Sequence, residues 1–111
     1  MTGTGASGYA TLGEVLALEY AAAAYWVGEA LRVDGGQSAV AGAERSYTTA
    51  IALYPGFPDP YRELAVLLSE HGGRPARIIA LWRRFLPLSP SAPQAPAIAQ
   101  ALDRLEQRRR T

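Results

Sequence analysis

The sequence contains no cysteine, no lysine and no asparagine, and it has a single histidine, His71. Without cysteine the chain has no disulfide, no thiolate nucleophile and no cysteine-ligated zinc site. A metal site built on His71 would have to rest on carboxylates alone, and no nucleophile accompanies the neighbouring pair Glu70-His71. We therefore expect a protein that is not an enzyme and that has no catalytic residues, no metal site and no cofactor.

We also expect no N-terminal leader, and the sequence has no long uninterrupted apolar run. Residues 1–8 contain neither a basic segment nor the continuous apolar segment of a secretory signal. The most apolar stretch, residues 15–31, is interrupted by Glu19 and Glu29 and is shorter than the roughly 20 residues that span a bilayer. We expect a cytoplasmic protein with no membrane span.

What the sequence has in excess is alanine, with 21 residues among 111. Alanine has the highest helix propensity, whereas β-branched residues are few and apolar–polar alternation is rare. The apolar content of 49% is that of a folded domain. The composition therefore predicts an all-α fold.

Glycine and proline clusters divide this helical sequence into segments. Short connections between helices imply antiparallel neighbours, so we expect about five antiparallel helices in one domain over residues 11–111. Residues 1–10, rich in glycine, threonine and serine, are expected to form a flexible tail. The helices are predicted at residues 11–33, 38–53, 59–70, 75–88 and about 94–109.

Two copies of one unit, residues 24–56 and 59–91, follow each other at an offset of 35 residues. Their bulky, small and turn positions recur in register: Trp26 with Tyr61, Ala30 with Ala65, Val33 with Leu68, Tyr47 with Trp82, Ala50 with Phe85, and Pro55 with Pro90. A fixed period of 20 to 50 residues is typical of stacked supersecondary units that share a core. We expect Trp26, Ala30 and Val33 to form the core stripe of the first helix.

The repeated pattern resembles the tetratricopeptide repeat (TPR), W-x2-L-G-x2-Y followed by A-x3-F and P. The resemblance covers residues 24–91. Glu29 replaces the family's leucine, and Ala30 and Ala65 replace its glycine. The resemblance implies a TPR-like α-solenoid of two helical hairpins, with the segment at about 94–109 as a C-terminal capping helix.

The same resemblance implies a concave face, lined by first helices, that grips a partner peptide or helix. Carried onto this sequence, the partner-binding groove would be formed by Val27, Leu31, Asp34, Arg62, Val66, Ser69, Ala97, Ala101 and Arg104. Each set of three follows i, i+4, i+7 and so forms one helical stripe. The implied function is a protein-binding scaffold, although these residues would alternatively pack against the long first helix.

The first predicted helix is longer than a repeat helix, and its extension is apolar on more than one side. An excess apolar face at the end of a stack needs a cover. We expect another subunit to supply it, so that the chain forms a homodimer or larger homo-oligomer through its N-terminal helix.

Charge is divided unevenly along the chain. Residues 1–70 hold three arginines and eight acids, whereas residues 71–111 hold eight arginines and two acids. An alternative function is therefore an accessory protein that contacts nucleic acid or another polyanion through the basic half. A helical stack with one acidic and one basic end has the same charge pattern, so we expect a protein or peptide partner before a nucleic acid.

Overall fold

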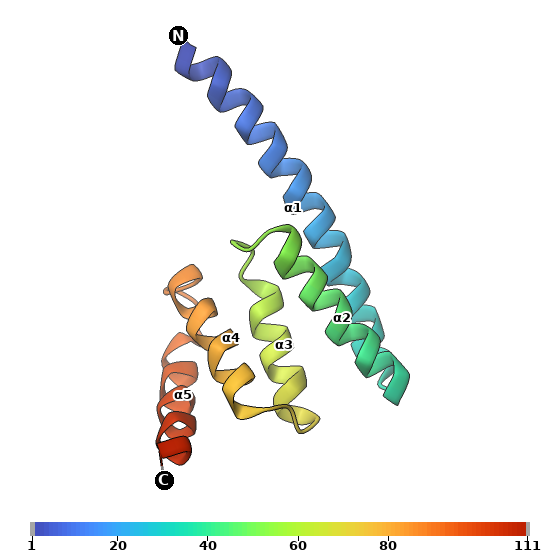
Figure 1. The fold of residues 1–111 in the computed structure, drawn as a ribbon, viewed down its shortest axis with the longest axis vertical. Coiled ribbons are helices and arrows are strands. Elements are labelled where there is room, and N and C mark those ends of the chain that lie inside the picture. Colours follow the sequence, from blue (N-terminus) through green and yellow to red (C-terminus); the bar gives the residue numbers. More distant parts are fainter. Residues whose placement is uncertain (1, 111) are drawn as a thin grey trace. The chain divides into compact units, whose positions relative to one another are not determined.

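The computed structural model describes the backbone of residues 2–110 and the side chains of residues 12–110 (Figure 1). Over that range the chain is helical and contains no strand, which confirms the predicted all-α class with five helices. The helices are α1 (Thr2–Asp34), α2 (Gln37–Leu53), α3 (Asp59–Glu70), α4 (Pro75–Leu88) and α5 (Ala95–Arg110). The chain forms two compact units, Met1–Phe57 and Pro58–Thr111, and each is described by itself.

The helix boundaries follow the glycine and proline clusters. Pro60 and Pro75 each occupy the first turn of a helix, where the missing backbone N–H removes no intrahelical bond. α1 differs from the sequence prediction, because it begins at Thr2 and not at Thr11. The predicted flexibility of residues 1–10 stays a prediction, since their side chains lie outside the described residues. That the two hairpins stack as a solenoid also stays a prediction.

The turns inside the two hairpins have different lengths. Two residues separate α1 from α2, and four residues, 71–74, separate α3 from α4. Each turn contains a glycine in the left-handed region, Gly35 with φ 76° and Gly72 with φ 78°, where other residues are strained. These glycines stand 37 positions apart, whereas the second helices keep the offset of 35. One offset therefore cannot align both helices of the two units.

The first helices end 36 positions apart, at Asp34 and Glu70, whereas the second helices end 35 apart, at Leu53 and Leu88. An offset of 35 therefore displaces the predicted core stripe of α1, and that prediction is wrong. Trp26 is 65% exposed and Val33 is 87% exposed, and Ala30 is exposed as well. Tyr61, the residue matched to Trp26, is only 2% exposed, so the two aromatic residues have dissimilar surroundings. The buried face of α1 lies one to two positions earlier, at Tyr25 and Gly28.

The core of the first unit depends on a close approach of α1 and α2 at Gly28. A Cβ atom on Gly28 would lie 2.7 Å from Cε1 of Tyr47, so only glycine leaves room for that ring. The Tyr47 ring packs against Tyr25, which in turn meets Phe57 edge to face at 5.5 Å between centroids. On α2, Ala43, Tyr47 and Ala50 are fully buried.

A buried hydroxyl fixes the register of this hairpin. The Tyr47 hydroxyl donates a hydrogen bond of 2.5 Å to Oε1 of Glu29 on α1. Burial, reinforced by the Glu29 carboxylate, raises the pKa of the Tyr47 hydroxyl well above its ordinary value of 10.0. The hydroxyl therefore stays protonated and keeps donating across the α1–α2 interface.

The second unit has a larger apolar core. α3 and α4 bury Tyr61, Leu64 and Phe85 almost completely, and Trp82 meets Phe85 edge to face at 5.9 Å between centroids. The Arg84 guanidinium lies 5.3 Å from the centroid of the Tyr61 ring and donates to its hydroxyl at 3.2 Å. α5 packs on α4 and buries Ile98 and Leu102, while Leu105 is half-buried.

Candidate functional site

The most exposed apolar surface of the described chain lies on α1. Between residues 12 and 20 every side chain except Ala17 is exposed, and Ala21 is the first buried residue. Figure 1 shows that this part of α1, which we call the α1 extension, continues beyond the end of α2. Its exposed large apolar residues are Leu12, Val15, Leu16, Leu18 and Tyr20.

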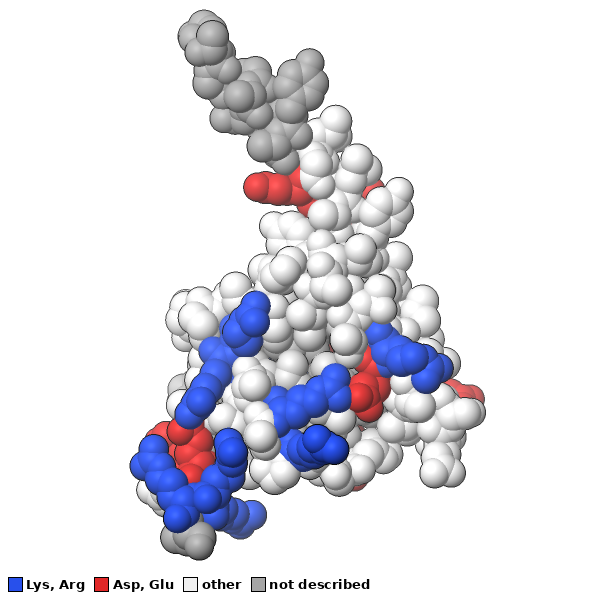
Figure 2. Space-filling model, in the orientation of Figure 1, with Lys and Arg blue, Asp and Glu red and all other residues white. Residues whose placement is uncertain are grey.

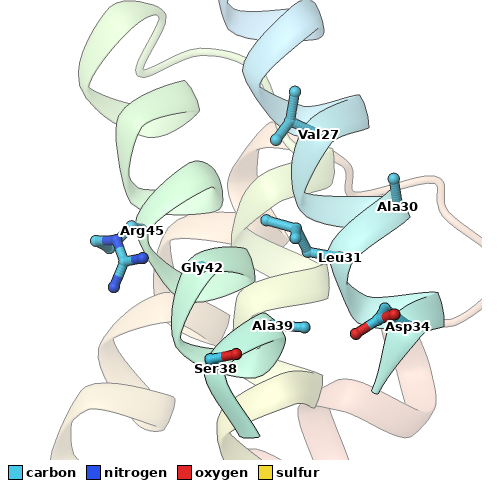
Figure 3. A pocket seen from close by; sticks show the side chains of 8 residues that line it. All are labelled: Val27, Ala30, Leu31, Asp34, Ser38, Ala39, Gly42 and Arg45. Carbon is cyan, nitrogen blue, oxygen red and sulfur yellow. The ribbon is translucent and has the colours of Figure 1, made fainter. Parts of the chain in front are cut away.

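A shallow groove runs between α1 and α2 on one side of the first hairpin (Figure 3). Figure 3 shows the Leu31 side chain directed from α1 toward Gly42 on α2. We call this feature the α1–α2 groove. It is lined by Val27, Ala30, Leu31, Asp34, Ser38, Ala39, Gly42 and Arg45.

Gly42 forms the floor of the groove. A Cβ atom at Gly42 would lie 3.0 Å from Cδ1 of Leu31, closer than most Cβ contacts. The absence of a side chain at this buried position therefore lets the Leu31 side chain pack closely against α2.

The groove continues toward the α1 extension. A second depression is lined by Ala24, Val27, Leu31, Gly42, Arg45, Ser46 and Thr49, and it shares four of these residues with the first. On α1 the same helix face carries Leu16, Tyr20 and Ala23 farther toward the N-terminus, because residues three and four apart lie on one face. Together they form an apolar strip about 22 Å long from Leu16 to Leu31, which we call the α1 strip.

The first three of the nine predicted partner-binding residues contribute to this site. Val27 and Leu31 line both depressions, and Asp34 stands at the end of the first. The sequence prediction missed the α2 wall, including Gly42 and Arg45. An isolated glycine inside a helical segment is a signal of close backbone approach, and it identifies Gly42 in retrospect.

The other six predicted residues lie in the second unit. Arg62 donates to Glu63 at 3.2 Å and lies 5.8 Å from the centroid of the Phe85 ring, and the Ser69 hydroxyl donates to the Ala65 carbonyl at 2.8 Å. Val66 is half-buried. On α5, Ala101 is half-buried, whereas Ala97 and Arg104 are exposed.

A separate basic cluster occupies the α4–α5 side of the second unit. Arg83 on α4 pairs with Glu106 on α5 at 2.5 Å, and Arg109 and Arg110 line the same depression. Figure 2 shows arginines surrounding acidic side chains near the C-terminal end of α5. Three guanidinium groups and one carboxylate leave this cluster with a positive charge.

The described residues offer no chemical centre of another kind. No group of three or more His, Asp or Glu side chains among them is arranged to hold a metal ion. None of the helices in the described part of the chain combines the length and the apolar character needed to cross a bilayer. Comparison with protein-family models, curated proteins and solved structures finds no match to this chain.

Proposed function

We propose that the chain is a cytoplasmic, non-catalytic scaffold module of the TPR-like type that uses no cofactor. It binds the apolar face of an amphipathic helix, from another protein or from a second copy of itself. The observation that carries the proposal is the α1 strip, which leads into the α1–α2 groove.

The dimensions and the chemistry of this surface suit a helix. A strip about 22 Å long corresponds to about four helical turns. Amphipathic helices are recognised through anchors at i, i+3, i+4 and i+7 that enter an apolar groove, and the groove lined by Val27 and Leu31 would receive such anchors. Arg45 and Asp34 border the apolar part and would contact the polar flanks of the bound helix.

The proposal is tested by capture of partners on the immobilised chain, with Val27→Glu as the groove variant. Val27 is 53% exposed, so the variant retains its fold while it places a charge in the groove. Val33→Glu is the matched control, because it adds the same charge on the same helix about 120° around the axis from Val27, at a residue that does not line the groove. Loss of the captured protein with Val27→Glu alone supports the proposal, and equal capture by both variants contradicts it.

A second candidate function is contact with a polyanion through the basic cluster, favoured by the meeting of Arg83, Arg109 and Arg110 around one carboxylate. Arginine suits phosphate recognition because its guanidinium donates in a planar fork. Binding of single-stranded RNA to the purified chain would weaken steeply between about 50 and 200 mM salt. Arg109→Gln with Arg110→Gln would abolish such binding, whereas Val27→Glu would leave it intact. The absence of any RNA binding at low salt refutes this candidate.

A further inference from the structure

Resting on the proposed function, we propose that the helix in the α1–α2 groove is α1 of a second copy of this chain. In this arrangement two α1 helices pack antiparallel, related by a two-fold axis that passes between Ala23 and Ala24. Each α1 extension thereby covers the groove of the other copy.

The α1 strip is self-complementary under that symmetry. A two-fold axis between Ala23 and Ala24 places Leu16 opposite Leu31 of the second copy and Tyr20 opposite its Val27. Large apolar residues thus meet at both ends of the strip, and alanines meet in the middle. Small residues at the centre allow the two helix axes to approach to about 8 Å, the short end of the packing range.

Charge favours this face of α1 over the other exposed face. The face that carries Val15, Trp26 and Val33 also has an approximate two-fold pattern, but it would place Glu19 against Glu29 of the second copy. Like charges directly apposed across an interface are destabilising. The α1 strip avoids this clash because all of its residues are uncharged, and the entering α1 extension carries no basic residue that would repel Arg45 at the border of the groove.

Disulfide trapping tests the axis directly, because the chain has no cysteine of its own. Ala23→Cys would form a disulfide-linked dimer under mild oxidation, since the two Ala23 positions adjoin the axis. Val27→Cys alone would give at least about tenfold less dimer, because two Val27 residues would stand about 10 Å apart along the helix axis. A mixture of Tyr20→Cys chains with tagged Val27→Cys chains would form the mixed disulfide.

Val33→Cys is the control for random collision, because Val33 is exposed on another face of α1. Trapping of Ala23→Cys above this control, with the mixed disulfide, supports the antiparallel dimer. Two results overturn it: Val27→Cys trapped as efficiently as Ala23→Cys, which indicates parallel helices, or no trapping of Ala23→Cys in a chain whose circular dichroism shows an intact fold.

Light scattering separates this inference from the function on which it rests. The wild-type chain would be a dimer that Val27→Glu, but not Val33→Glu, converts to a monomer. A wild-type monomer at all concentrations that still captures another protein through Val27 overturns the two-fold dimer and leaves the scaffold function standing. A monomer whose capture is indifferent to Val27→Glu overturns both.

Discussion

The two helical hairpins differ in how much of their large apolar side chains they bury. The α3–α4 hairpin buries its large side chains, and Tyr61, Leu64 and Phe85 are each at most 2% exposed. The α1–α2 hairpin closes through alanines, Gly28 and two tyrosines, and α1 leaves most of its leucines and valines exposed. Buried apolar area is the main favourable term in folding, so the second unit carries more of its own stability. The first hairpin instead leaves apolar surface exposed, which is the surface that the proposed partner helix would cover.

The largest expected effect comes from a pair of aromatic truncations, one in each unit. Phe85→Ala would lower the free energy of unfolding by about 3 to 5 kcal/mol, because it leaves a cavity at a fully buried site. Trp26→Ala would lower it by less than about 1 kcal/mol, because the indole is mostly exposed and its recorded ring contact is with Tyr25. Urea unfolding of both variants measures the difference, and similar losses would contradict the contrast between the hairpins.

The same substitution at two glycines of α1 should have opposite effects. Gly28→Ala would destabilise the first hairpin by about 1 to 3 kcal/mol, because its Cβ atom would collide with the Tyr47 ring. Gly13→Ala would stabilise the helix by about 0.5 to 1 kcal/mol, because nothing lies within 4 Å of its Cβ position. Thermal unfolding followed by circular dichroism compares the two variants, and a shift of the same sign in both would refute the close approach at Gly28.

The Tyr47 hydroxyl makes the first hairpin sensitive to alkaline pH. Tyr47→Phe would lower the free energy of unfolding near neutral pH by about 1 to 2 kcal/mol, because the bond to Glu29 is lost. The raised pKa in the folded state means that the Tyr47 contribution is complete below pH 10.0 and is lost as pH rises above that value. Denaturant unfolding at a series of pH values should show a smaller alkaline loss in Tyr47→Phe than in the wild type. Equal losses would show that Tyr47 is not responsible.

The smallest effect is expected at the surface of the second unit. Glu106→Gln removes the ion pair with Arg83, whose side chain is 59% exposed. Exposed ion pairs contribute about 0.2 to 1 kcal/mol, and salt weakens them further. Urea unfolding at low and at high salt should show a small loss that disappears at high salt. A loss as large as that in Tyr47→Phe would mean that the α4–α5 contact depends on this pair.

The sequence predicts the helices better than it predicts the face that each helix buries. Pro60, Pro75 and the turn glycines mark helix ends through local backbone chemistry, so those boundaries are readable without tertiary information. The buried face of α1 depends on the number of residues between it and the core of α2, and that number differs between the units. The first helices end 36 positions apart and the second helices 35 apart, so a uniform offset of 35 displaces the predicted face of α1. The uniform offset therefore places Trp26 in the core in place of Tyr25.

The sequence predicts only the α1 side of the candidate site, because the α2 side depends on packing between helices. Val27 and Leu31 are recoverable because helical spacing alone places them on one face of α1. The α2 wall depends on which residues approach α1 most closely, and that property of Gly42 arises from packing between helices. Distances between neighbouring helices cannot be read directly from a single sequence.

The placement of the two tryptophans gives each unit its own optical reporter. Trp26 is exposed on α1, whereas Trp82 is only 8% exposed in the core of the second unit. Indole emission shifts to longer wavelengths in water, so the two side chains emit differently in the folded chain and converge when it unfolds. Variants that retain one tryptophan would therefore follow the melting of each unit separately.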